Sequence, residues 1–226
     1  MKKLGHLGLA MLLAAPISYG IYYFGFESSA VVFPIVVGLT CNLPDVDGKL
    51  QRMTGKNGYP IIRDIFSITH RGRFHTVFFG IIVGLVSGSL TFSLSTGVTS
   101  IGVTGLFGGF SGVLFHLFGD VVTPTGINFA PPITGNYSFD LFRFDNLVAN
   151  FGFGLIGLMS LGIFLALATN PSLMFVLGVL FVYGVGVPLI ILCASNVDIR
   201  YGGSSKSLFR SPFTIKFWVV LVRKIL

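Results

Sequence analysis

Charged side chains are scarce in this sequence of 226 residues. They make up 10% of the chain, whereas soluble domains carry about 25%. Hydrophobic residues make up 53%, and the mean hydropathy is +0.85. So few charges cannot cover the surface of an ordinary soluble domain. The composition therefore excludes that class and indicates an integral membrane protein.

Cysteine is also rare, because the chain has only Cys41 and Cys193. Two cysteines exclude a disulfide-stapled scaffold, and both lie near segment ends that the charge pattern places in the cytoplasm, where thiols stay reduced. We expect no disulfide, and we interpret Cys41 as a packing residue rather than a metal ligand.

The apolar residues gather into runs that approach the roughly 20 residues a membrane-spanning helix needs. The second run is short. Together they predict an all-α membrane bundle of about six transmembrane helices, forming a single domain over residues 1–226. The predicted spans are Leu4 to Phe24, Ala30 to Leu43, Phe74 to Leu94, Val98 to Gly119, Leu147 to Ala168 and Leu173 to Ala194.

The basic residues fix an orientation. If the N-terminus is inside, the loops 44–73 and 120–146 and the C-terminal tail are inside too, and all fifteen Lys and Arg lie in the cytoplasm. The loops around Glu27, Ser95 and Asn170 contain no basic residue. We therefore predict a multi-pass inner (plasma) membrane protein with both termini cytoplasmic. The +7 charge flanks apolar runs, so no direct nucleic-acid binding is expected.

Two segments have alternative interpretations. The first run could be a cleaved signal peptide, although a second run follows almost at once and cleavage would discard His6. Residues 206–226 carry five basic residues around an apolar stretch, which favours an amphipathic helix on the inner leaflet. A short seventh span is the alternative for that tail.

Glycines recur at four-residue spacing in the fourth span, as Gly105 with Gly109 and Gly108 with Gly112. Small residues at this spacing let helices approach closely in lipid. We interpret them as packing positions and not as a phosphate-binding loop.

Asp45 and Asp47 follow the second span, directly after Pro44. In an extended backbone these two carboxylates point to the same side, which suits one metal ion or a bridge between two. A solvated helix end is the alternative interpretation.

Two histidines, His70 and His75, flank a basic turn at the start of the third span. Neutral imidazole is a common transition-metal ligand, and Arg71 and Arg73 have the planar donor groups that bind phosphate. Ordinary contact with lipid headgroups is the alternative for this motif.

His116 and Asp120 are spaced i, i+4 near the cytoplasmic end of the fourth span, so they share one helix face. An ionisable group at that depth usually faces the bundle interior for a functional reason, although a satisfied core histidine is the alternative. His6 lies at the same face in the first span. Four separate segments thus predict one metal centre, with these candidate ligands: His6, Asp45, Asp47, His70, His75, His116 and Asp120.

In combination, these motifs resemble the YdjM-type family of inner-membrane, metal-dependent hydrolases. The resemblance covers roughly residues 1–132 and rests on Gly5-His6, LTCNLPDVD (39–47), HRGRFHT (70–76) and HLFGDVVTPTG (116–126). Family members often have Thr before the second histidine of the HRG motif and Ser after it, where this chain has Phe74 and Thr76. The family is also described as LexA-binding and is distantly similar to zinc-dependent phospholipase C.

The resemblance implies hydrolysis of a phosphoester by metal-activated water. Catalysis is expected at Asp47, His75 and Asp120, with Arg71 and Arg73 holding the phosphate. Seven donor side chains are more than the four that one tetrahedral ion binds, so one or two divalent transition-metal ions are expected. Zinc is the first candidate, and manganese and iron are the alternatives.

The loop 121–146 combines prolines with aromatic residues, which suits a lid at headgroup level over an amphiphilic substrate. Thr123 and Asn128 are its candidate substrate-binding residues, and plain interfacial packing is the alternative. Asp140, Arg143 and Asp145 are expected to form solvated ion pairs.

The leading hypothesis is a membrane-embedded hydrolase of a lipid or amphiphilic phosphoester at the cytoplasmic leaflet. A metal-ion transporter or sensor is the first alternative, although it should carry ionisable residues near mid-bilayer, which are almost missing here. A non-catalytic adaptor that recruits a cytoplasmic protein partner is the second.

Overall fold

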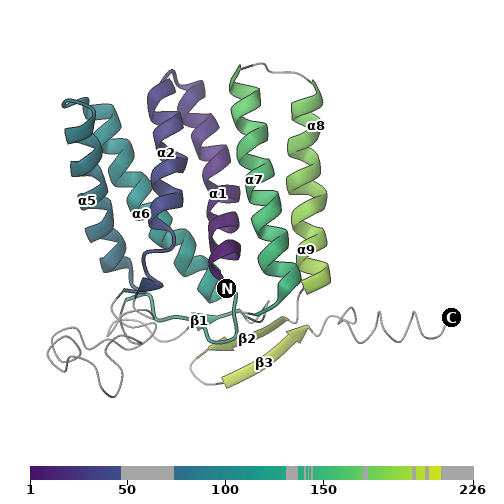
Figure 1. The fold of residues 1–226 in the computed structure, drawn as a ribbon. Coiled ribbons are helices and arrows are strands. Elements are labelled where there is room, and N and C mark those ends of the chain that lie inside the picture. Colours follow the sequence, from purple (N-terminus) through teal and green to yellow (C-terminus); the bar gives the residue numbers. More distant parts are fainter. Residues whose placement is uncertain are drawn as a thin grey trace, which may run out of the picture.

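A computed structural model gives the fold of the chain (Figure 1). It describes residues 1–46, 74–130, 137–139, 141, 143, 145–169, 173–194, 197–201 and 204–209. Within them the helices are α1 (Lys3–Tyr23), α2 (Glu27–Thr40), α5 (Val77–Leu94), α6 (Thr99–Val121), α7 (Leu147–Thr169), α8 (Leu173–Phe181), the π-helical turn η1 (Val182–Gly186) and α9 (Val187–Ala194).

The predicted all-α membrane bundle is confirmed. In the described residues, five helical segments are long and apolar enough to cross a membrane, the last running through α8, η1 and α9. The second predicted span, Ala30 to Leu43, is instead the helix Glu27–Thr40, which is shorter than these five. Each of the other predicted spans coincides with a helix to within a few residues, because long apolar runs leave little freedom in where a helix begins and ends.

The sixth span is interrupted by the π-helical turn Val182–Gly186, where Val187 N–H bonds to the carbonyl of Val182, five residues back. Pro188 follows two residues after this turn, and it has no N–H to bond to the carbonyl of Gly184. A wider turn at this point lets the helix continue on the other side of the proline.

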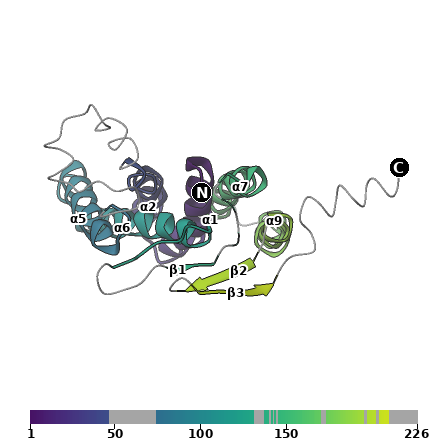
Figure 2. The same cartoon turned by 90° about the horizontal axis from the view of Figure 1, so that it is seen from below.

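The helices lie side by side, and the view from below shows their order (Figures 1 and 2). α6 contacts α5, α2 and α1, and α1 in turn contacts α2 and α7. Because α6 is inclined, its C-terminal end reaches the N-terminal end of α1 (Figures 1 and 2). That crossing brings together chain segments more than a hundred residues apart.

The predicted packing role of the glycines in α6 is confirmed, and the two pairs serve different neighbours. A Cβ atom at Gly109 would lie 2.6 Å from Ser87 Oγ of α5, and one at Gly105 would collide with Thr91 of the same helix. A Cβ atom at Gly108 would lie 3.1 Å from Val36 of α2. Two interleaved small-residue motifs therefore let α6 pack closely between α5 and α2.

Two prolines inside helices are compensated by hydroxyl groups on neighbouring helices. Pro16 has no N–H for the carbonyl of Leu12, four residues back, and Tyr183 Oη donates to that carbonyl at 2.5 Å. Pro34 likewise frees the carbonyl of Ala30, which accepts a hydrogen bond from Ser18 Oγ. Inside a membrane no water is available for such groups, so these bonds make the prolines tolerable.

A small antiparallel sheet lies beneath the bundle, at the end where α1 begins (Figure 1). Its strands, in the order β1-β2-β3, are β1 (Tyr137–Ser138), β2 (Val197–Tyr201) and β3 (Ser204–Phe209). The sequence analysis did not predict it. Residues 206–209 of the predicted amphipathic tail belong to β3, so the expected helix cannot begin at Lys206, and residues 210–226 lie outside the described residues.

Candidate metal centre

The ends of α2 and α5 supply two of the predicted ligands. After α2 ends at Thr40, Pro44 prevents further helix and two turns follow, with Leu43 N–H bonded to Thr40 O and Val46 N–H to Leu43 O. Asp45 lies in the second turn. On α5, Thr76 is the N-cap and its hydroxyl accepts from Phe79 N–H at 3.2 Å, so His75 stands immediately before the helix.

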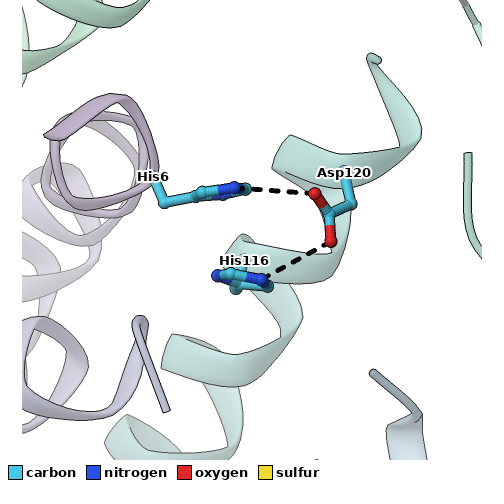
Figure 3. Close-up of side chains that lie close together, drawn as sticks. All are labelled: His6, His116 and Asp120. Carbon is cyan, nitrogen blue, oxygen red and sulfur yellow. Dashed lines mark ion pairs between the residues drawn. The ribbon is translucent and has the colours of Figure 1, made fainter. Parts of the chain in front are cut away.

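The crossing of α1 and α6 supplies the other three. His116 and Asp120 lie one turn apart on the same face of α6, and His6 lies in the first two turns of α1. Figure 3 shows both imidazole rings directed at the Asp120 carboxylate, each facing a different oxygen. The local cause is Gly119, because a Cβ atom there would lie 2.5 Å from His6 Nδ1.

The five side chains converge on a small volume. Nε2 of His75 and Nε2 of His116 are 3.4 Å apart. Asp120 Oδ2 lies 3.4 Å from His75 Nε2 and 3.5 Å from His116 Nε2, and Asp45 Oδ1 lies 3.9 and 3.7 Å from the same two nitrogens. His6 Nε2 lies 3.6 Å from Asp120 Oδ1, which is also 3.7 Å from the amino nitrogen of Met1.

The site is almost fully enclosed. The side chains of His6 and His116 are 0% exposed, and those of His75 and Asp120 are 1% and 3% exposed. Asp45 is the exception at 22%. The centre is therefore open to its surroundings on the Asp45 side alone, as far as the described residues go.

The donors present fit a divalent transition metal. In two groups of three, the donor atoms all lie within 4.8 Å of one another: His6 with His116 and Asp120, and Asp45 with His75 and His116. Donors bound to one tetrahedral ion at about 2.0–2.1 Å lie about 3.4 Å apart, which is close to the separations seen here. Three imidazole nitrogens with carboxylate oxygens form a mixed ligand set that suits zinc, manganese or iron.

Unpaired buried nitrogens support the same conclusion. Among the described residues, neither ring nitrogen of His6 has a hydrogen-bond partner, and neither has Nδ1 of His116. A buried polar group without a partner is destabilising by a few kcal/mol, roughly 1–3 in protein interiors. Coordination through Nε2 would remove this penalty for one nitrogen of His6, whereas a plain core histidine would be expected to have a hydrogen-bond partner.

Five of the seven predicted metal ligands thus come together, whereas Asp47 and His70 lie outside the described residues. Arg71 and Arg73 lie outside them too. The metal and catalytic roles stay predictions, but the side chains they require lie close together.

The two predicted substrate-binding residues are engaged locally. Thr123 is fully buried, and its hydroxyl donates to the carbonyl of Asp120 at 2.7 Å and lies 3.1 Å from Thr125 Oγ1. Asn128 Oδ1 accepts from Ala130 N–H at 3.3 Å. These contacts give Thr123 a role in positioning the turn after Asp120, and a direct role in binding substrate stays a prediction for both residues.

The predicted lid segment 121–146 is tied to the bundle by its backbone. Phe139 N–H bonds to Val121 O and Leu141 N–H to Val122 O, each at 2.8 Å, and Val77 N–H bonds to Phe129 O at 3.0 Å. These bonds join the segment to the ends of α6 and α5 that carry the site. Its role as a lid stays a prediction.

Two of the other predictions on this side of the bundle are confirmed. Arg143 and Asp145 form an exposed ion pair at 3.4 Å, while Asp140 lies outside the described residues. Cys41 is buried and donates to Gly38 O, and both it and Cys193 are free, so neither is in a disulfide.

Sequence analysis missed three supporting residues: Thr76, Gly119 and Asn150. Asn150 Oδ1 accepts from Lys2 N–H at 2.6 Å and so holds the start of α1 against α7. The position of Thr76 before an apolar run is a recognisable capping signal, and a glycine next to a ligand, as Gly119 is to Asp120, can indicate a close contact between helices. The partner of Asn150, 148 residues away, leaves no signal in a single sequence.

The comparison with known proteins supports the resemblance that these motifs carry. The sequence matches the family described as YdjM inner membrane protein over residues 1–195. The chain belongs to this family. The YdjM match extends well beyond residue 132, where the motif resemblance ended, and includes α7, α8 and α9. No curated protein and no solved structure matches the chain.

Membership of the YdjM family establishes a membrane protein with several apolar helices and an inner-membrane classification. The family description names no reaction, metal or substrate. Those assignments depend on the chemistry of the site itself.

Proposed function

We propose that the protein is a membrane-embedded, metal-dependent hydrolase that cleaves a phosphoester of a lipid or amphiphile. The observation that supports this most is the convergence of three buried imidazoles and two carboxylates at one end of an apolar bundle. Ionisable groups in such an environment are rarely retained without a function.

Four side chains are proposed to hold the catalytic ion: His75, His116, Asp45 and Asp120. When bound, a divalent metal lowers the pKa of a coordinated water and polarises a phosphoryl oxygen. The chain contributes a buried, low-dielectric environment, and its partly exposed Asp45 is the proposed side of entry for substrate and water. Two buried imidazoles adjoin that side, because Asp45 Oδ1 lies 3.7 Å from His116 Nε2 and 3.9 Å from His75 Nε2.

The place of the site supports the proposed substrate class. It lies at the ends of spanning helices, where the phosphate of a lipid is found while its chains stay among lipid neighbours. Arg71 and Arg73 belong to the same short motif as His75, and their donor forks match a phosphate group.

We assign the site to the cytoplasmic leaflet because the basic residues surround its end of the bundle. Lys2, Lys3 and Arg143 lie at this end, whereas the turns around Glu27 and 95–98 at the other end have no basic residue. The positive-inside rule then orients the bundle. Labelling of a Ser95→Cys variant by an impermeant thiol reagent should occur from outside the cell, and labelling from inside alone would reverse the assignment.

The test uses the purified protein in vesicles that contain phosphatidic acid or phosphatidylglycerol, with release of phosphate or of glycerol phosphate as the readout. His75→Ala and Asp120→Asn should each lower the rate by more than about a hundredfold, since even residues that only support metal ligands contribute 10–100-fold. Thr104→Ala is the matched control, because Thr104 is a buried polar residue at the other end of α6.

Wild-type rates in His75→Ala or Asp120→Asn would contradict the proposal. Metal flux into the vesicles without hydrolysis would favour transport instead. Unchanged rates in Thr104→Ala are needed to attribute the loss to the site rather than to the fold.

A further inference from the structure

The rings of His6 and His116 are stacked, with centroids 4.0 Å apart and planes inclined by 19°. Both Nε2 atoms face the Asp120 carboxylate, but they face different oxygens (Figure 3). His6 Nε2 is 3.6 Å from Oδ1, and His116 Nε2 is 3.5 Å from Oδ2.

Two stacked imidazole rings are poorly placed to coordinate the same ion. The lone pair of an imidazole nitrogen lies in the ring plane, so two nearly parallel rings direct their lone pairs along nearly parallel lines. The two lone-pair lines are separated by about the 4.0 Å distance between the stacked rings. A zinc ion on one of these lines, about 2.0–2.1 Å from its nitrogen, would therefore lie off the line of the other nitrogen. The Nε2 lone pairs of His6 and His116 are therefore directed at two different ion positions.

The pair His75 and His116 behaves differently. Their planes are inclined by 62° and their centroids are 5.2 Å apart. Two imidazoles on one tetrahedral ion would place their centroids about 5 Å apart with their nitrogens about 3.4 Å apart. Both expectations are met, since the two Nε2 atoms are 3.4 Å apart. His75 and His116 thus converge on one point, and His6 points to another.

We propose that the centre holds two divalent transition-metal ions bridged by the carboxylate of Asp120. This inference rests on the proposed function and adds a second cation position to it. Oδ2 serves the ion held by His75, His116 and Asp45, and Oδ1 serves the ion held by His6. Bridged pairs in hydrolases are about 3.5–4 Å apart, which agrees with the stacking distance of the two rings.

The two positions differ in access and in ligand number. The position near Asp45 has four protein donors among the described residues and one partly exposed side, from which a water would join as a fifth ligand. The position near His6 has a fully buried imidazole, both of whose nitrogens are without a hydrogen-bond partner in the described part of the chain. With fewer described donors, the His6 position should bind its ion more weakly and lose it first to a chelator.

The experiment measures metal content and magnetic coupling in the full-length protein. Wild type purified with Mn²⁺ should retain about two equivalents and give the spectrum of a coupled Mn²⁺ pair in electron paramagnetic resonance. His6→Ala should retain about one equivalent and give the spectrum of an isolated Mn²⁺ ion.

Gly119→Ala provides a second route that removes no ligand. Its Cβ would lie 2.5 Å from His6 Nδ1 and force that ring away, so it should also lose the coupled spectrum. Gly38→Ala is the matched control, because its Cβ would meet only the flexible ends of Met11 and Leu7, at 3.2 and 3.7 Å. The control should retain the coupled pair.

The outcomes separate this inference from the proposed function. One equivalent in both wild type and His6→Ala would overturn the second position and leave a single-ion hydrolase. Loss of all metal in folded His6→Ala would also overturn it, because His6 would then share one ion with the other ligands. Absence of retained metal in wild type would overturn both this inference and the proposed function.

Discussion

Removal of the Tyr183 hydroxyl should destabilise the bundle in a way that depends on Pro16. Tyr183 Oη donates to the carbonyl of Leu12, which Pro16 leaves without its helical partner, and Ser160 Oγ lies 2.6 Å from the same hydroxyl. In Tyr183→Phe that carbonyl loses its donor inside the membrane. Unsatisfied buried groups cost about 1–3 kcal/mol, and interhelical hydrogen bonds in membranes average about 0.6 with a maximum near 1.7. We expect a loss of about 1–2 kcal/mol.

The dependence on Pro16 comes from the backbone. In Pro16→Ala, the new N–H of residue 16 can bond to Leu12 O in the ordinary helical manner. Tyr183→Phe should then cost less than about 0.5 kcal/mol, giving a coupling of about 1 kcal/mol between the two positions. A variant with Ser160→Ala in every background removes the contribution of the second hydroxyl.

The assay is reversible unfolding of the four proteins of the cycle in mixed micelles with increasing denaturing detergent. Equal costs of Tyr183→Phe in the two backgrounds would refute the reasoning. They would show that the hydroxyl stabilises the protein through something other than the carbonyl that Pro16 frees.

Three further predictions concern packing and metal. Ser18→Ala should destabilise the protein by about 1 kcal/mol in the wild type. In the Pro34→Ala background it should cost less, because the N–H of Ala at position 34 can bond to the carbonyl of Ala30. An equal cost in the two backgrounds would argue against this. Gly157→Ala should lower the unfolding free energy by about 1–3 kcal/mol, because its Cβ would collide with the backbone of α1, whereas Gly162→Ala on the same helix meets open space and should be neutral or stabilising by up to about 1 kcal/mol; similar effects at both would contradict the assigned α1–α7 contact. Removal of metal by a chelator should lower thermal stability, and readdition at about 100 times the dissociation constant should restore about 2.7 kcal/mol; identical melting with and without metal would oppose a resident ion.

The membrane bundle could be predicted because its signals are local and redundant. Apolar length defines the spans, and the basic residues define the loops between them. The α2 boundary was less accurate because Ala30 to Leu43 ends in polar and turn-forming residues that hydropathy alone does not resolve. The sheet escaped prediction because β1 has only two residues and pairs with a strand some sixty positions away.

For the candidate site, the sequence predicted the membrane face at which the ligands lie, but not which ligands contact one another. His6, Asp45, His75 and His116 could be placed at one membrane face from their positions at span ends. The inclination of α6, which brings Asp120 to His6, depends on glycine contacts with two other helices. That helix crossing could not be predicted from a single sequence, and the stacking of His6 on His116 depends on it.

X-ray absorption spectroscopy of the metal in the purified protein tests the central claim most directly. The account predicts nitrogen and oxygen ligands at about 2.0–2.1 Å, with the multiple-scattering pattern of imidazole, and a weaker imidazole contribution in His75→Ala, which keeps His6 and His116. A protein without bound metal, or a metal whose ligand shell contains no imidazole, would contradict the account.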